Sequence, residues 1–498
     1  MKFREKLLKI KVPFNNKKPK KVYSILCNRN RFDPVFRLIL AGEIVNKEKR
    51  DNLILFTSSK NNYFNKIFEN FGIKKHLYLN LSELLSLNFI KSFYFFLKAI
   101  LIIIYFSFFK INYFIENFSI KKNKVGRLIY EDYHRRNFNY RKKKKLISIN
   151  FFIKIFLAYL LVDYLENFVK EHQIRYIFLN DNNYLSPQSI LFLLGKKYKI
   201  KTVLLGQEKI IKYSKKKDYI KRFYVLEKSD FKKKVSKTEI NKYLKKRFDG
   251  SVKNKDHINA FKNKKILNKD ILQTQIKRNF RNYRKTILFC PHAFSDSTMG
   301  LGDFIFNDYY EFYCESLKKM SSIEDILWII KLHPTRKFYN EIGIGEKYLK
   351  GLNTKNLVIC PDNFHTLSLI KCVDAVVTGR GTVTCEAASV GVESLAFKVN
   401  RFQNLNFYTK YKSKKDYFNK LRFIHKPPNL SLKKKNYAKK ALFLMNQKYF
   451  TTRDKIFLDE RKVKNTEEYL KNVIGFFETK PKKIYDSFYY KKLKQVLI

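Results

Sequence analysis

Residues 374–391 read DAVVTGRGTVTCEAASVG, and this stretch decides the predicted fold. Its apolar start predicts a buried strand at residues 375–377, and the Thr-Gly-Arg-Gly-Thr segment that follows predicts a tight turn. A helix is expected to open at Thr382, whose side chain is suited to cap the first turn. We expect Gly379 and Gly381 to take backbone conformations that a β-carbon disfavours, so that the chain can approach a ligand closely.

The same turn carries groups that suit a phosphate. The free N–H groups at the start of a helix favour an anion by ~0.3–1 kcal/mol, and Arg380 adds a forked cationic donor. Thr382 and Glu386 lie four residues apart on one helix face, where a carboxylate can accept from ribose hydroxyls. With Thr378, these residues predict a cradle for a nucleotide mono- or diphosphate. The alternative is a strand, turn and helix with a glycine-rich corner and no ligand.

A second segment, DILWIIKLHP at residues 325–334, is a continuous apolar run of strand length. Such a run is typical of a parallel strand that is buried on both faces. Pro334 ends the strand, so Lys331 and His333 are expected at its carboxyl end, where ligands bind in open α/β sheets. The alternative for His333 is a structural role.

Strands and helices alternate along both halves of the chain, as a doubly wound sheet requires. In the second half, the alternation runs from a predicted strand at TILFCP (residues 286–291) to one at SLAFKV (residues 394–399). Between them, a strand is predicted at 356–360 and a helix at 363–373. A helix is also expected to open at Ser186-Pro187. In the first half, the predicted strands are at residues 22–27, 52–57, 128–130, 176–179 and 202–205.

These segments together resemble a known family. KLHP paired with TGRGTVTCEAASVG resembles the C-terminal half of bacterial surface-polysaccharide glycosyltransferases with the GT-B architecture. That group includes capsule-synthesis Kdo transferases and, more distantly, bacterial sialyltransferases. PHAFSDS at residues 291–297, followed by FNDYYEFY, fits the same pattern.

GRLIYEDYHRR at residues 126–136 resembles the G-D-L-I-Y-D-T-Y-L-R signature of the same proteins. It departs from the signature at Arg127, where Asp is usual, at Glu131-Asp132, which replaces a single Asp with a small neighbour, and at His134, which replaces Leu. The resemblance implies an α/β, GT-B-like fold with two Rossmann-like doubly wound domains, a cleft between them and C-terminal helices. It also implies a CMP- or UDP-linked sugar donor on the C-terminal side and an acceptor glycan or glycolipid on the N-terminal side.

At 498 residues, the chain is too long for one ordinary core. C-terminal helices of the resembled fold brace the first domain, and residues 437–449 are the candidate. The predicted organisation is a basic N-terminal extension at 1–20, an N-terminal acceptor domain at 21–227, a charged connector at 228–284, a C-terminal nucleotide-sugar domain at 285–426 and a helical extension at 427–498.

Catalysis follows from the implied reaction. Inverting glycosyl transfer needs a base for the acceptor hydroxyl and donors that stabilise the leaving phosphate. The first candidate for the base is Asp132, because it is expected to follow a strand and matches the family's Asp; the second is Asp181, in FLNDNNY. For each, a strand-end residue that caps a helix is the alternative. His333, Lys331, Arg380 and the N–H groups of Gly381 and Thr382 are the phosphate candidates. Further cleft candidates are Glu131, His134, His292, Ser295 and Asp296.

No D-x-D pair and no cysteine–histidine cluster with metal-ligand spacing occurs, so the sequence predicts no metal and no cofactor besides the donor. Two other functions stay open: a polyol-phosphate transferase of the teichoic-acid type, and a non-catalytic basic binding protein.

The net charge of +61 would ordinarily suggest nucleic acid. Lys, Asn, Ile, Phe and Tyr are all abundant, however, which is typical of an AT-rich genome, and the lysines are spread along the chain. We therefore expect no nucleic-acid partner, whereas an anionic membrane surface remains a possible one. The sequence does not indicate an oligomeric state.

Six cysteines without a C-x-x-C pair, and no signal peptide, predict a cytoplasmic protein, peripheral on the inner face of the cell membrane. One apolar stretch, FYFFLKAILIIIYFSFF at residues 93–109, has nearly the length of a membrane span. Three alternatives fit it: a buried helix, a helix on the membrane surface, or a true span.

Overall fold

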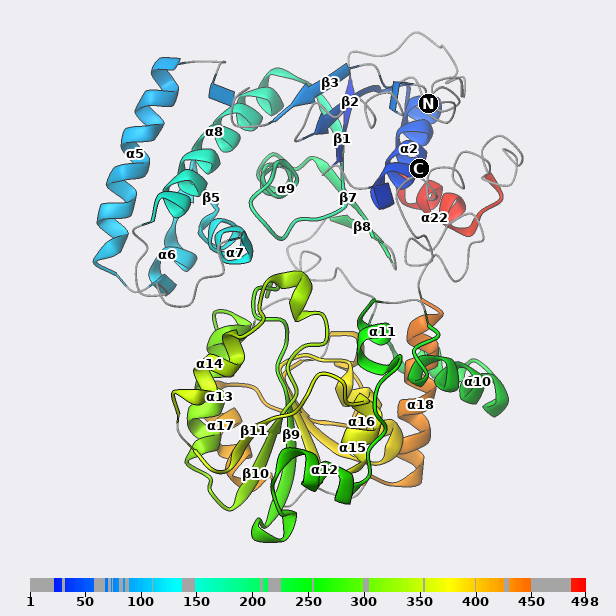
Figure 1. The fold of residues 1–498 in the computed structure, drawn as a ribbon. Helices are drawn as coiled ribbons and strands as arrows, with labels where there is room; N and C mark the ends of the chain where they lie inside the picture. Colours follow the sequence, from blue (N-terminus) through cyan, green and yellow to red (C-terminus); the bar gives the residue numbers. More distant parts are fainter. Residues whose placement is uncertain are drawn as a thin grey trace, which may run out of the picture. The chain divides into compact units, whose positions relative to one another are not determined.

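A computed structural model describes much of the chain: residues 22–28, 32–57, 68–69, 73, 75–79, 84–85, 89–109, 111–136, 148–206, 209–213, 225–252, 255–298, 304–352, 354–398, 400–424, 430–448 and 485–498. The predicted N-terminal extension lies outside these residues. The chain forms two compact units (Figure 1). The first comprises Met1–Arg222 and Tyr449–Ile498, and the second is Phe223–Lys448.

The first unit is built on a six-stranded sheet in the order β3-β2-β1-β6-β7-β8, in which only β8 is antiparallel to its neighbour. The central strands are apolar on both faces: Ile25 and Ile54, which are paired in register, belong to one core cluster, and Leu26 and Leu55 belong to the other. The strands are β1 (Tyr23–Asn28), β2 (Asn52–Thr57), β3 (Lys75–Tyr78), β6 (Ile174–Leu179), β7 (Lys201–Leu205) and β8 (Ile210–Tyr213).

Helices cover this sheet. α9 begins as predicted, since Ser186 caps it and Pro187 takes its first position. C-terminal helix α22 completes the first unit: Tyr489, Leu493 and Leu497 join the core cluster that contains Leu26. The helices are α2 (Phe32–Lys49), α5 (Phe89–Ser107), α6 (Ile111–Asn117), α7 (Gly126–Arg136), α8 (Ile149–Glu171), α9 (Pro187–Lys197) and α22 (Phe488–Leu497).

Two expectations for this unit are wrong. The strand predicted at residues 128–130 is the first half of helix α7, which follows a hairpin of β4 (Ser119–Ile120) and β5 (Asn123–Lys124). A three-residue apolar run fits a buried helix as well as a strand. The buried-helix alternative for residues 93–109 also fails, because only 22% of an 18-residue window of α5 is buried. By length and composition, α5 is the one helix among the described residues that could cross a membrane.

The second unit contains a six-stranded sheet that is parallel throughout, in the order β11-β10-β9-β12-β13-β14. The strands predicted around residues 286, 326 and 375 are confirmed, and all five residues of β10 are buried. The strands are β9 (Lys285–Cys290), β10 (Ile326–Ile330), β11 (Leu357–Ile359), β12 (Ala375–Thr378), β13 (Glu393–Ala396) and β14 (Thr409–Lys410).

Residues 228–284, predicted as a connector, lie within this second unit. Leu272 and Ile276 sit among many charged residues in the sequence, yet they pack against the sheet residues Leu288 and Leu327. The elements of this segment are η3 (Lys228–Lys232), α10 (Lys237–Phe248), α11 (Lys255–Phe261), α12 (Lys269–Ile276) and η4 (Phe280–Asn282).

The candidate brace at residues 437–449 is also placed differently. It falls in α18, which packs on α16 and α10 of the second unit, whereas α22 packs on the first. The remaining helices are α13 (Tyr309–Ser321), η6 (Arg336–Tyr339), α14 (Ile344–Lys350), α15 (Thr366–Lys371), α16 (Val383–Val390), η7 (Asn400–Phe402), α17 (Lys414–Phe423) and α18 (Leu432–Asn446).

Candidate functional site

The order of strands in the second unit defines a switch point between β9 and β12. The chain runs outward from β9 to β10 and β11, then crosses back to β12 on the other side of β9. Ligands of open α/β sheets bind at the carboxyl ends of such strands. His292 follows β9 here, and the Gly379-Arg380 turn follows β12. Of the two segments singled out from the sequence, residues 374–391 therefore supply one side of this switch point, and residues 325–334 form β10, one strand away on the other side of β9.

A row of aromatic rings lines the same edge. The His292 ring stacks on the Tyr309 ring, with 4.3 Å between their centroids and 16° between their planes. His333, which follows β10, also stacks with His292, with 5.5 Å between their ring centroids. Because β10 is the neighbour of β9, a histidine at each strand end reaches the same place.

His333 is held as a neutral imidazole. The backbone N–H of Thr335 donates to its Nδ1 at 3.4 Å, and the Thr335 hydroxyl lies 2.9 Å from the same atom. Burial, together with the neighbouring His292, lowers the pKa of His333 to about 3. An amide N–H is an obligatory donor, so Nδ1 is the acceptor and the ring proton is on Nε2. His333 thus offers a neutral N–H donor at this edge.

The loop after β9 is fixed by Glu341, which sequence reasoning missed. Its carboxylate accepts the Phe294 N–H at 3.0 Å, and the Ser295 N–H and hydroxyl each at 2.8 Å. Burial raises the pKa of Glu341, and these hydrogen bonds oppose that rise. Asp296 accepts the Ser297 N–H at 2.9 Å and lies 3.8 Å from His292. Both hydrogen-bond donors of Ser295 are therefore bound to Glu341, whereas Asp296 lies beside His292.

The glycine-rich turn needs its glycines for space rather than for special dihedral angles. Neither Gly379 nor Gly381 has a positive φ, which corrects the expectation. A β-carbon at Gly379 would lie 3.4 Å from both the Phe304 and the Phe312 ring, and one at Gly381 would lie 3.0 Å from the Thr378 hydroxyl. Each is a tight or van der Waals contact in a packed corner.

Arg380 is only 4% exposed. Its guanidinium carbon lies 4.8 Å from the Phe304 ring centroid and 5.1 Å from that of Phe397, and its NH1 group donates to the Thr298 carbonyl at 3.2 Å. The expected open cationic fork is therefore a buried group that holds the turn against aromatic rings. Its positive charge still lies at the switch point.

Helix α16 opens at Val383 with Thr382 as its N-cap residue, but the Thr382 side chain makes no capping hydrogen bond, contrary to expectation. Glu386, predicted to face a ribose, is buried and forms an ion pair of 2.5 Å with Arg247 of α10. Burial disfavours the charged guanidinium, yet the pKa of Arg247 is raised because Glu386 outweighs burial. Arg247 escaped sequence reasoning because its segment resembled a connector.

Lys331 is buried at the end of β10, and its ammonium group donates to the Phe364 carbonyl at 3.0 Å. No carboxylate among the described residues lies within ion-pair distance of it. A buried ammonium group without a carboxylate is costly, which keeps Lys331 as a candidate for an anionic ligand.

The first unit places the candidate bases on neighbouring segments. Asp132 is on helix α7 instead of after a strand, is buried, and pairs with Lys154 of α8 at 2.7 Å. Glu131 is also buried, and the His134 ring stacks on the Tyr130 ring with 5.6 Å between centroids.

Asp181 follows β6, as predicted, and is only partly buried. Its Oδ1 accepts the N–H groups of Asn182 at 2.7 Å and Asn183 at 3.2 Å, so one carboxylate oxygen shapes the loop. This loop lies against α7, because the Leu185 N–H donates to the Leu128 carbonyl at 3.2 Å. The structure therefore brings the two candidate segments side by side at the carboxyl edge of the first sheet.

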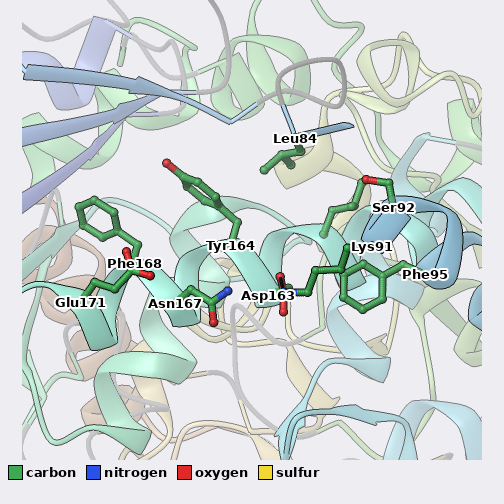
Figure 2. Close-up of a pocket in the computed structure, with 10 residues that line it drawn as sticks. Leu84, Lys91, Ser92, Phe95, Asp163, Tyr164, Asn167, Phe168 and Glu171 are labelled. Atoms are coloured by element: carbon green, nitrogen blue, oxygen red, sulfur yellow. Dashed lines mark ion pairs between the residues drawn. The ribbon is translucent and has the colours of Figure 1, made fainter. Parts of the chain in front are cut away.

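A cavity of about 310 Å³ opens elsewhere in the first unit, between α5 and α8 (Figure 2). Lys91 and Asp163 form an ion pair of 2.6 Å on its wall. Carboxylates, an amide and aromatic rings are suited to a hydroxyl-rich ligand, and no predicted site residue takes part. The signal in the sequence was Asp163, a carboxylate that follows the apolar run FLAYLLV of α8. The lining residues are Leu84, Lys91, Ser92, Phe95, Leu160, Asp163, Tyr164, Asn167, Phe168 and Glu171.

No protein-family model and no curated protein sequence matches the chain. Solved structures match it at low similarity. A glycosyltransferase from Rickettsia africae ESF-5 is 9% identical, with 93% of this chain and 99% of that chain covered and a TM-score of 0.26. KpsC from Thermosulfurimonas dismutans, a beta Kdo 2,4 transferase, is 13% identical, with coverage of 55% and 88% and a TM-score of 0.27.

UDP-GlcNAc 2-epimerase from Neisseria meningitidis, bound to UDP-GlcNAc, is 10% identical, with 86% of this chain and 99% of that chain covered and a TM-score of 0.25. The strand order of this chain itself defines an α/β protein with two Rossmann-like doubly wound domains, the GT-B-like class.

Proposed function

We propose that the protein is a glycosyltransferase that moves a sugar from a CMP- or UDP-linked donor to a growing cell-surface polysaccharide, such as capsule or O-antigen. The observation that carries the proposal is the switch point of the second sheet. There, His292 follows β9 and stacks with His333, which follows β10, while the Arg380 turn and the start of α16 follow β12 on the other side of β9. Hydrogen-bond donors and the positive end of the α16 dipole therefore lie at the edge where open α/β sheets bind their ligands.

The donor phosphates would lie at this edge. His333 would donate a hydrogen bond through Nε2. The N–H groups of Gly381 and Thr382, at the start of α16, would donate hydrogen bonds to the phosphate oxygens and stabilise the negative charge that develops as the sugar departs. Lys331 and Arg380 add buried positive charge. These groups supply phosphate stabilisation without a metal, and we propose metal-independent, inverting transfer with no cofactor besides the donor.

The base belongs to the first unit in this proposal, and two carboxylates compete for the role. The resemblance favours Asp132, but its carboxylate is 3% exposed and paired with Lys154. A base has to reach the acceptor hydroxyl, and Asp181 is the more exposed of the two at a strand end. We place the protein in the cytoplasm, peripheral on the inner face of the membrane, with a glycan or glycolipid acceptor.

Saturation-transfer NMR against CMP, CDP, UDP and GDP tests the proposal. Contact with the ribose and base protons of CMP or UDP is expected. His333→Ala should weaken the contact, and His172→Ala in the first unit, also a partly buried stacked histidine, should not. Binding of none of the four nucleotides would refute the function. A phosphodiester-linked product with release of CMP would identify a polyol-phosphate transferase instead.

A further inference from the structure

The first unit exposes a long apolar surface on helix α5. Residues at spacings of three and four form the buried stripe of α5: Ser92, Phe95, Ala99, Ile103 and Phe106. Most other positions of α5 carry large apolar side chains. We call this surface the α5 face, and it includes Phe93 at 56% exposure, Leu101 at 64%, Ile104 at 52% and Phe108 at 82%. Contiguous apolar surface of this kind marks a binding site or a membrane contact.

α5 is held along α8 and does not stand free of the domain. Phe95 stacks on Tyr159 with 5.5 Å between centroids, and Phe96 meets Phe152 edge to face at 5.1 Å. Near the start of α5, Lys91 pairs with Asp163. Figure 1 shows the two helices running beside each other. One side of α5 is therefore committed to the folded unit, so the helix offers only its other side to a partner.

Positive charge borders the α5 face. Lys98 lies on α5 itself, with its ammonium group 4.4 Å from the Tyr94 ring centroid. Lys121 and Lys122, at the turn between β4 and β5, are exposed, and Lys121 shares Asp163 with Lys91. A second copy of the chain would bring like charges together across a two-fold interface. An anionic lipid surface attracts them instead.

We infer that the α5 face docks in the plane of an anionic lipid bilayer, with its apolar side chains at the boundary between headgroups and acyl chains and the flanking lysines at the phosphates. The purpose of this docking rests on the proposed function: it would hold the enzyme beside a lipid-linked acceptor. The docking itself is measured without nucleotide or acceptor, so the two proposals can fail separately.

The first test is flotation of the full chain with vesicles of phosphatidylcholine and phosphatidylglycerol. The wild type should float. The combined variant Phe93→Ser, Leu101→Ser, Ile104→Ser should lose binding by roughly 100-fold, since interfacial binding scales with buried apolar area. A control with Ile266→Ser and Leu432→Ser removes similarly exposed apolar groups from the second unit and should float like the wild type.

Equal flotation of the triple variant and the wild type would overturn the inference. Complete release of the wild type by high salt would also overturn it, because binding would then be electrostatic without apolar insertion. An α5-dependent dimer in light scattering, with no flotation, would assign the face to a second copy and also overturn it. An unchanged melting temperature of the triple variant separates lost docking from lost folding.

The second test measures depth with Leu101→Trp. The native Trp328 is fully buried in the second unit and provides a constant background. Bromine atoms near the glycerol end of the acyl chains should quench the new tryptophan more strongly than bromine atoms near the chain ends. The reverse order would place Leu101 at the bilayer centre, as a span requires, and would overturn the in-plane arrangement.

Discussion

Replacing His333 by Ala removes the hydrogen-bond donor that we place on the donor phosphate. A hydrogen bond to a charged group contributes ~1.5–3 kcal/mol, and 1.4 kcal/mol changes a dissociation constant tenfold. Loss of His333 should therefore weaken nucleotide-sugar binding by about 10- to 100-fold. Thr335 lies outside the proposed contact and orients the ring, so Thr335→Val should have a smaller effect.

The pH dependence tests the protonation state of His333. Because its folded-state pKa is lowered to about 3, the ring stays neutral down to that pH and contributes no charge near neutrality. A histidine at its ordinary pKa of about 6.5 would gain positive charge, and phosphate affinity, as the pH falls below that value. We therefore expect the His333-dependent part of the affinity to be constant between about pH 5 and pH 8.

Isothermal titration calorimetry with a nucleotide-sugar measures both effects, because its esterified phosphates do not titrate in this range. The difference in binding free energy between wild type and His333→Ala is followed against pH. His172→Ala is the matched control. An unchanged dissociation constant in His333→Ala would remove the residue from the site. A difference that grows on acidification would show that the ring is protonated in the complex and refute the neutral-donor argument.

Three further changes test other parts of the site. If Asp181 or Asp132 is the base, its replacement by Asn should cut turnover by ~10²–10⁴-fold at unchanged donor affinity. Wild-type turnover in both variants would show that neither residue is the base. Arg247→Met should lower the free energy of unfolding by ~3–5 kcal/mol in urea titrations, because Glu386 stays buried without its partner; a loss below ~1 kcal/mol would contradict the buried pair. Arg380→Ala should lower the melting temperature as well as nucleotide affinity, since the guanidinium packs between aromatic rings; weakened binding with an unchanged melting temperature would make it a ligand contact only.

The central strands of the second sheet were predictable because β9, β10 and β12 are apolar runs that are soon followed by Pro or Gly. A run such as ILWII has few folded alternatives, and the polar residue at its end is placed at the sheet edge by the strand itself. The placement of His333 and the Arg380 turn at the same edge of one parallel sheet follows from that regularity.

The orientation and burial of individual polar groups were not predictable in this way. LIY forms part of helix α7, whose first residue, Gly126, packs so closely that a β-carbon there would lie 2.3 Å from the Phe114 carbonyl oxygen. Arg380 is buried by Phe304, a residue 76 positions away in the sequence. Contacts of this range leave no local pattern.

The attachment of α22 to the first unit has a consequence for the order of folding. The Tyr176 hydroxyl donates to the Leu497 carbonyl at 2.8 Å, and the last turns of α22 fill the core beneath β1 and β2. The second unit is continuous in sequence, whereas the first unit requires a helix that the ribosome makes only after the whole second unit. The second unit can therefore fold during synthesis, while the first unit must wait, with its apolar sheet face uncovered, for residues 488–497 to emerge.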